Sequence, residues 1–348
     1  MFYNPIEGKS LGTEVYSAIA GKNPNLKNIK EATSYNDARM ILSNGLEKCG
    51  TTHIFIGSNK GGVGKSMIAL QLAWFLNARG YKVLLADLDA QANITSPLLK
   101  DDLLTEAGKS LYNVIVGDSN FDDIISEVTE GFDLMGANQD LSKIDYLLRS
   151  RESGKEEDNF FARDKRSSES NQIYQNMYEV FKKLGEDYDF VIYDTNPETN
   201  TFNRLSMQVS DIGIIPIQAK ESSAKAHMVT LSEINDSFIS INRDNSNIQD
   251  RVKLLFNNKE SIPESKKKDI LNKMFRHYSG SILNDFIEYS YELGEVSDVG
   301  YPAFAHPDID ISVLNNISNV VDEIVELARS VSSENNDKKK RHLFFNQL

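Results

Sequence analysis

The stretch Gly57-Ser-Asn-Lys-Gly-Gly-Val-Gly-Lys-Ser66 decides the fold of this chain. It closes a short apolar run that starts at residue 53, and it opens a helix-like pattern over residues 66–79. Glycines here let successive backbone N–H groups face one concave anion site, and a helix N-terminus adds partial positive charge. Lys65 would reach the β- and γ-phosphates of a nucleotide, and Ser66 would bind Mg²⁺.

The composition outside this loop is that of an ordinary folded protein. The chain has 348 residues, 40% of them hydrophobic, and a net charge of −13. These values exclude a disordered tail protein, a collagen-like chain and a coiled-coil rod. There is no apolar run of 18 residues, no secretory pattern at residues 1–10, and only one cysteine, Cys49. We therefore expect a cytoplasmic protein, nucleoid-associated if it binds DNA, in which any nucleic-acid contact comes from a local basic patch.

Apolar runs and helical patterns alternate along the rest of the chain. The runs at residues 81–86, 132–135, 190–193, 212–217 and 252–256 are typical of strands buried on both faces. Helical patterns lie near residues 172–184, 202–209, 223–241 and 264–277. This alternation predicts an α/β fold, a mostly parallel twisted sheet with helices on both faces.

The chain divides by composition into three parts. Residues 1–50 form an N-terminal extension with one predicted helix from about Ile29 to Leu46, either a surface helix behind a leader or an arm for dimerisation or partner binding. Residues 51–331 form the main domain, with a polar insertion at about residues 150–171. Residues 332–348 form a flexible basic and aromatic tail.

Four motifs resemble those of one family, in the family's order, over roughly residues 51–260. Lys60-Gly-Gly-Val-Gly-Lys-Ser66 looks like the deviant Walker A motif of the ParA/MinD ATPases. Residues 81–93 (YKVLLADLDAQAN) resemble the ParA form of the next motif, and residues 186–197 (EDYDFVIYDTNP) resemble the Walker B segment. Residues 214–220 (IIPIQAK) are similar to the family's Pro-x-Gln strand end. The resemblance implies a P-loop NTPase fold that uses ATP and Mg²⁺.

The resemblance also assigns roles to charged residues. Lys60 alone reads equally as a solvated loop lysine, but the family places this lysine in the site of a facing subunit, where it stabilises the transferring phosphate. Asp89 would position or activate the attacking water. Asp87 would lie near the metal and the switch region, and Asp194 would hold Mg²⁺ through a water. Acids that follow parallel strands converge beside the phosphate loop, although each could also be a plain turn carboxylate.

The nucleotide itself would be held by the loop and by one strand end. Asn257 follows a predicted strand and would hydrogen-bond the adenine. The loop residues that the resemblance assigns to the nucleotide are Gly61, Gly62, Val63, Gly64, Lys65, Ser66 and Met67.

Three positions depart from the expected patterns. Asn59 stands where the simple phosphate-loop pattern has glycine. Asn196 precedes Pro197 where the family has two prolines, which leaves the timing of the γ-phosphate switch open. Residues 281–291 lack the family's Pro-Arg turn, so no role is transferred there.

Two basic segments are candidate partner surfaces. Lys266, Lys273 and Arg276 share one side of a predicted helix and are candidate DNA-binding residues, although a solvated helix face has the same pattern. Residues 338–345 (KKKRHLFF) could contact an anionic membrane or DNA, and a disordered tail is the alternative.

The sequence as a whole predicts a slow ATPase that partitions or positions DNA or another cargo. On this reading ATP drives homodimerisation, the dimer binds non-specific DNA, and a ParB-like adaptor stimulates hydrolysis. One alternative is a MinD-like ATPase that works on a membrane surface. The other is a nucleotide-gated scaffold or co-regulator that hardly cleaves ATP.

Overall fold

Eight strands form one sheet in the computed structural model, in the order β3-β4-β2-β5-β1-β6-β7-β8. The structure describes residues 11–48, 50–99, 110–143, 175–197, 201–218, 251–258, 282–288 and 290–345. All described strand pairs are parallel except β3 with β4, which confirms the predicted fold class. The strands are β1 Thr52–Ile56, β2 Val83–Asp87, β3 Ile125–Thr129, β4 Phe132–Met135, β5 Phe190–Asp194, β6 Ile212–Ile217, β7 Val252–Asn258 and β8 Ile287–Glu288.

The central strands are apolar because both of their faces are covered. Every residue of β2, β5 and β6 is buried. The antiparallel edge strand β3 is different, since most of its residues are half-buried or exposed. It joins β4 through Glu130 and Gly131, and glycine in a two-residue link is a hairpin signal that the sequence analysis missed.

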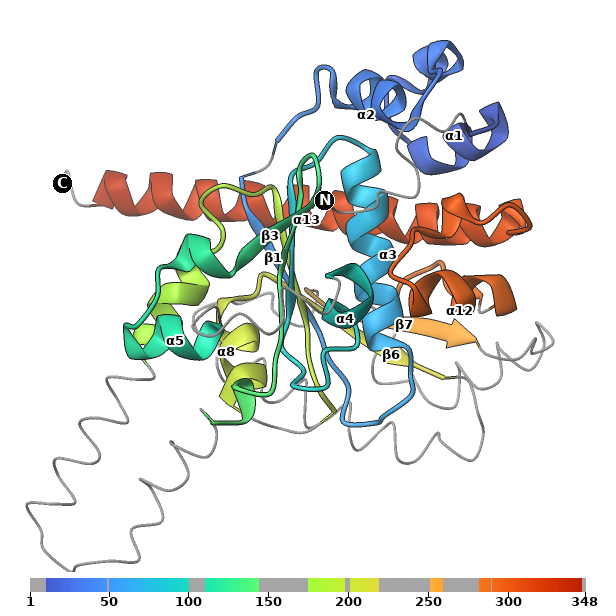
Figure 1. Ribbon diagram of the computed structural model, residues 1–348. Coiled ribbons are helices and arrows are strands. Elements are labelled where there is room, and N and C mark those ends of the chain that lie inside the picture. Colours follow the sequence, from blue (N-terminus) through green and yellow to red (C-terminus); the bar gives the residue numbers. More distant parts are fainter. Residues whose placement is uncertain are drawn as a thin grey trace, which may run out of the picture.

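Helices cover both faces of the sheet (Figure 1). On one face, α3 (Lys65–Ala78), α12 (Tyr291–Asp298) and α13 (Ile311–Phe345) share one apolar core with the strands. On the other face, α5 (Leu111–Val116), α8 (Thr201–Val209) and the helical residues 175–183 build a second core. Shorter elements are α4 (Thr95–Leu98), η2 (Phe121–Ile124) and η4 (Ala303–Ala305).

The N-terminal segment contains α1 (Thr13–Ala20), η1 (Leu26–Glu31) and α2 (Tyr35–Ser43). The prediction of one helix from Ile29 to Leu46 is wrong. The chain leaves helical geometry at residues 32–34, and Ser34 then caps α2 by accepting a hydrogen bond from the Asp37 N–H at 3.1 Å. Side chains of this segment, Tyr16, Ile19 and Leu42 among them, are buried in the same core as α3 and α13.

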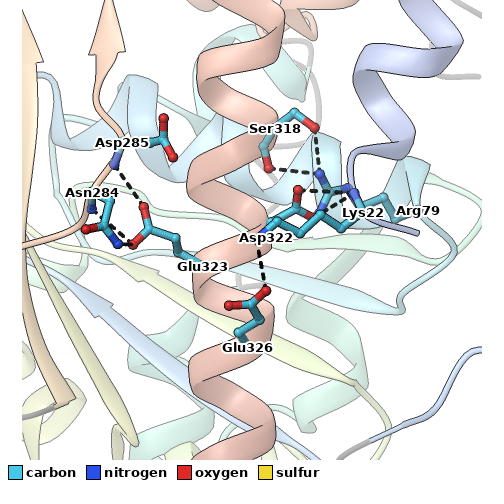
Figure 2. Close-up of polar contacts among 8 residues, drawn as sticks. All are labelled: Lys22, Arg79, Asn284, Asp285, Ser318, Asp322, Glu323 and Glu326. Atoms are coloured by element: carbon cyan, nitrogen blue, oxygen red, sulfur yellow. Dashed lines mark hydrogen bonds and ion pairs between the residues drawn. The ribbon is translucent and has the colours of Figure 1, made fainter. Parts of the chain in front are cut away.

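Helix α13 joins distant parts of the chain, as Figure 2 shows. Asp322 forms an ion pair with Arg79 at 2.8 Å and accepts from the Lys22 backbone N–H. One residue further along, Glu323 accepts from the backbone N–H groups of Asn284 and Asp285, just before β8. The helix therefore connects the N-terminal segment and the end of α3 to the β8 edge of the sheet.

The same helix runs past the predicted start of the C-terminal tail. Residue 332 lies inside α13, which continues to Phe345. Residues 311–345 contain neither glycine nor proline, so no residue there terminates the helix. Among the residues that the structure describes, no helix combines the length and the apolar character needed to cross a membrane.

Candidate functional site

The phosphate loop connects β1 to α3 and is braced from two other strands. Asn257, at the end of β7, donates its Nδ2 to the Val63 carbonyl at 2.8 Å. Gln218, just after β6, donates its Nε2 to the Gly62 carbonyl at 2.8 Å. A Cβ at Gly64 would lie 2.1 Å from the Asn257 Nδ2, so this approach requires glycine. The loop is thus held at its carbonyl groups.

Asp194 is a buried carboxylate beside the loop. It ends β5, its Cα pairs in register with that of Asp87 on β2, and neither of its oxygens has a hydrogen-bond partner among the described residues. Burial raises its pKa to about 8, with a further rise from the charge of Asp87, while Ser66 and Lys65 lower it. Burial also lowers the pKa of the Lys65 ammonium, which Asp194 and Asp89 partly oppose.

These residues fit a Mg²⁺ ion that is bound mainly by phosphate and water. Within the described ranges, no group of three or more His, Cys, Asp or Glu side chains could hold a metal alone. Mg²⁺ in nucleotide sites takes one or two protein oxygens and fills the rest of its shell with phosphates and water. The unpartnered Asp194 carboxylate and the Ser66 hydroxyl at the start of α3 are oxygens of this kind.

Asp87 is held differently from Asp194. Its Oδ2 accepts from the Thr95 N–H at 3.0 Å and from the Thr95 hydroxyl at 2.7 Å, and its Oδ1 accepts from the Asp89 N–H at 3.1 Å. Burial raises its pKa to about 6 despite these bonds. The sequence predicts that Asp87 is a metal ligand. In the structure, both of its oxygens hold the loop that carries Asp89.

Asp89 lines a cavity of ≈ 720 Å³ that also contains the phosphate loop. The cavity is also lined by Gln91, Ile94 and Pro97, which follow Asp89 in the chain. The end of α12 contributes Ser297 and Asp298 to the lining. The loop residues that line the cavity are Gly61, Gly62, Gly64, Lys65, Ser66 and Met67. Val63, Lys60, Asp194 and Asn257 are not among the lining residues.

The segment after Asp194 is hydrogen-bonded on both sides. Thr195 donates its hydroxyl to the Ile56 carbonyl at 2.8 Å, which ties it to β1. The Asn196 carbonyl accepts from Asn203 Nδ2 at 3.1 Å, which ties it to α8. Pro197 lines the cavity. The unusual Asn196 thus occupies a defined position in which its backbone is hydrogen-bonded.

Two contributors were missed by sequence reasoning. Thr95 lies six residues after Asp89 and carries no motif, yet it holds Asp87 through two hydrogen bonds. Gln218 belongs to a segment that was recognised, but its contact with the phosphate loop follows only from the parallel pairing of β6 with β1. The candidate DNA-binding residues Lys266, Lys273 and Arg276 lie outside the described residues.

Comparisons with known proteins place this site in a family. A profile described as an AAA domain matches residues 51–249, more than half of the chain. The chromosome partitioning protein ParA of Caulobacter vibrioides is 23% identical over 287 residues, which cover 82% of this chain and 96% of the relative. This chain belongs to the ParA-type ATPase family. An uncharacterized protein of Methanocaldococcus jannaschii is 28% identical, covering 53% of this chain and 66% of its own length.

Solved structures support the fold of this ParA-type ATPase. The ATP complex of Cyanothece McdA superposes with a TM-score of 0.56 at 18% identity, covering 80% of this chain and 96% of that one. Cobyrinic acid a,c-diamide synthase from Mycobacterium smegmatis, bound to ADP and magnesium, gives 0.53 at 23% identity, covering 72% and 91%. Because both proteins are less than 25% identical to this chain, their likeness supports only the fold.

Proposed function

We propose that this ParA-type ATPase hydrolyses ATP slowly to move or position a large cargo. ATP would drive formation of a homodimer that binds DNA without sequence preference, and a ParB-like partner would stimulate hydrolysis and release the dimer. The observation that carries this proposal is the convergence of Lys65, Ser66 and Asp89 on one cavity, with the unpartnered Asp194 beside it.

Each of these side chains has a distinct part in the proposed reaction. Lys65 and the N-terminus of α3 bind the β- and γ-phosphates. Ser66 and Asp194 hold Mg²⁺, which neutralises charge on the phosphates when it is bound. Asp89 orients the water that attacks the γ-phosphate, which requires a carboxylate that reaches the cavity.

The position of Lys60 is our reason to expect a dimer. It lies five residues before Lys65, on the far side of the glycines, and it does not line the cavity of its own chain. A second copy facing the cavity would bring its own Lys60 to the γ-phosphate, where a cation stabilises the charge of the transition state. ATP then belongs to both subunits, so its hydrolysis would release them.

The test separates nucleotide binding, dimerisation and turnover in three variants. Asp89→Ala with Mg-ATP should sediment as a stable dimer that hardly hydrolyses ATP, and with Mg-ADP as a monomer. Lys60→Ala should still bind ATP but remain monomeric, whereas Lys65→Ala should not bind ATP. Rapid turnover by Asp89→Ala would overturn its role, and a Lys60→Ala dimer that hydrolyses ATP normally would overturn the shared site.

A further inference from the structure

Thr95 connects the core of the sheet to the loop that carries Asp89. It begins α4 and is completely buried. Its hydroxyl donates to Asp87 Oδ2 at 2.7 Å and accepts from the Ala137 backbone N–H at 2.8 Å. Few side chains both donate and accept through one atom, and threonine does so with a rigid β-branched geometry. The hydroxyl therefore fixes Asp87 relative to the chain just after β4.

The other oxygen of Asp87 continues this path to Asp89. Asp87 Oδ1 accepts from the Asp89 N–H at 3.1 Å, and Asp89 Oδ1 in turn accepts from the Gln91 N–H at 2.9 Å. Four consecutive hydrogen bonds thus lead from Ala137 through Thr95 and Asp87 to the turn that aims Asp89 into the cavity. Loss of the second bond would leave Asp87 Oδ2 held by the Thr95 backbone N–H alone, at 3.0 Å, and so loosen the third.

Helix α4 also packs closely against the backbone at two glycines. A Cβ at Gly136 would lie 2.9 Å from Thr95 Cγ2, and one at Gly300 would lie 2.9 Å from Leu98 Cδ2. The carbonyl of Gly300 accepts from the Trp74 indole N–H at 3.0 Å, which fastens this turn to α3. The elements on either side of α4 are therefore fixed, one by the sheet and one by the helix that begins at the phosphate loop.

The loop between Asp89 and α4 is backbone-strained. Ala92 has φ +52°, a left-handed conformation that costs a non-glycine residue about 1–2 kcal/mol. Its N–H donates to the Asp89 carbonyl at 2.8 Å, and its carbonyl accepts from the Ser96 N–H at 2.9 Å. A strained turn persists only where its surroundings over-determine it, and α4 provides that constraint.

We propose that Thr95 is a positioning residue, which fixes Asp87 and thereby sets where the Asp89 carboxylate stands in the cavity. The inference rests on the proposed function, in which Asp89 orients the attacking water. Thr95 touches neither nucleotide nor water in this account. Its removal should slow the hydrolytic step and leave ATP binding to the phosphate loop unchanged.

Three variants test the proposal by single-turnover hydrolysis of Mg-ATP. Thr95→Val keeps the shape and removes the hydroxyl, Thr95→Ser keeps the hydroxyl, and Thr51→Val removes a hydroxyl that donates to the Gly185 carbonyl at the opposite end of β1. We expect Thr95→Val to slow hydrolysis roughly tenfold to a hundredfold with ATP affinity within about twofold. Thr95→Ser and Thr51→Val should hydrolyse ATP at the wild-type rate. Wild-type turnover by Thr95→Val, or equal loss in Thr95→Ser, would overturn the proposal.

A second measurement uses the nucleotide-free protein and does not depend on catalysis. Amide hydrogen exchange at residues 89–95 should accelerate in Thr95→Val, because the Asp89 N–H and Thr95 N–H lose a fixed acceptor, while residues 65–78 of α3 keep wild-type protection. Unchanged exchange at residues 89–95 would overturn the proposal. If the wild-type protein cleaves no ATP with any partner, the proposed function fails, and this exchange experiment still decides the role of Thr95.

Discussion

At its first turn α3 carries Lys65 beside Asp194, whose two oxygens have no hydrogen-bond partner in the described part of the chain. Directly after its last turn, Arg79 hydrogen-bonds to the Ile19 carbonyl, to Ser318 twice and to Asp322. Both ends bury ionisable groups, but only at the Arg79 end do several hydrogen bonds and an ion pair hold them. Buried polar groups without partners are unfavourable for folding, so they mark the end where a ligand is expected to complete the site.

The largest expected effect is on ATP binding at the N-terminus of α3, which carries Lys65. Lys65→Ala should abolish the rise in melting temperature that Mg-ATP gives the wild-type protein, because ligand stabilisation follows binding to the native state. Lys48→Ala, which removes an exposed lysine paired with Asp189, is the matched control. Retained ATP stabilisation in Lys65→Ala would contradict the assignment.

The next largest effect is on the stability that Arg79 provides after the C-terminus of α3. Arg79→Met should lower the free energy of unfolding by about 3–5 kcal/mol, because Asp322 is left as an unpaired buried charge. The double variant Arg79→Met/Asp322→Leu should recover much of that loss in urea titrations, since no charge stays buried. ATP affinity of the folded protein should not change in either variant. An Arg79→Met protein as stable as the wild type would remove the contrast between the two ends.

A smaller effect, with a defined pH dependence, comes from Asp194. Its folded-state pKa of about 8 lies above the ordinary value of 3.8, so the folded protein binds the extra proton. Its contribution to stability is therefore complete below about pH 4 and is lost as the pH rises towards 8. Asp194→Asn without nucleotide should be more stable than the wild type at pH 8 by at least about 1 kcal/mol, with a shrinking difference towards pH 4. Urea titrations at pH 5, 6.5 and 8 measure this difference, and one that grows towards low pH would contradict the account.

The smallest effect concerns the strained turn. Ala92→Gly should raise the free energy of unfolding by about 0.5–1 kcal/mol, because glycine adopts φ +52° without steric cost, partly offset by greater freedom in the unfolded chain. Ala90→Gly, two residues earlier and without positive φ, should instead destabilise the protein or leave it unchanged. Thermal melts of both variants show whether glycine stabilises the protein only at Ala92, where φ is positive, or equally at a neighbouring position of the same loop. Equal destabilisation by both would show that Ala92 is not strained.

The sequence was most informative where local pattern and chemistry coincide. The predicted strands at residues 132–135 and 212–217 match β4 and β6 residue for residue, because buried strands read as unbroken apolar runs. The phosphate loop was located because its glycines, Lys65 and Ser66 are adjacent in the chain. Asp87 and Asp194 lie side by side at the carboxyl ends of β2 and β5, as expected for acids that follow two parallel strands.

What the sequence did not reveal depends on contacts between distant segments. The Arg79–Asp322 pair joins residues 243 positions apart, and no local pattern indicates it. The role of Asp87 as the holder of a loop depends on Thr95, whose hydroxyl direction only the fold defines. Helix α13 passes residue 332 because helix ends need a terminating residue, and a change to polar composition alone is not one.

The most direct test of the central claim is the binding of purified Asp89→Ala to non-specific duplex DNA at moderate salt, with Mg-ATP compared with Mg-ADP. In this variant the phosphate end of α3 should bind ATP without turning it over, so any ATP-gated step accumulates. We expect DNA binding with Mg-ATP only, and this binding should fall steeply as salt is raised. A variant that forms dimers with Mg-ATP yet binds DNA with neither nucleotide would contradict the proposed function.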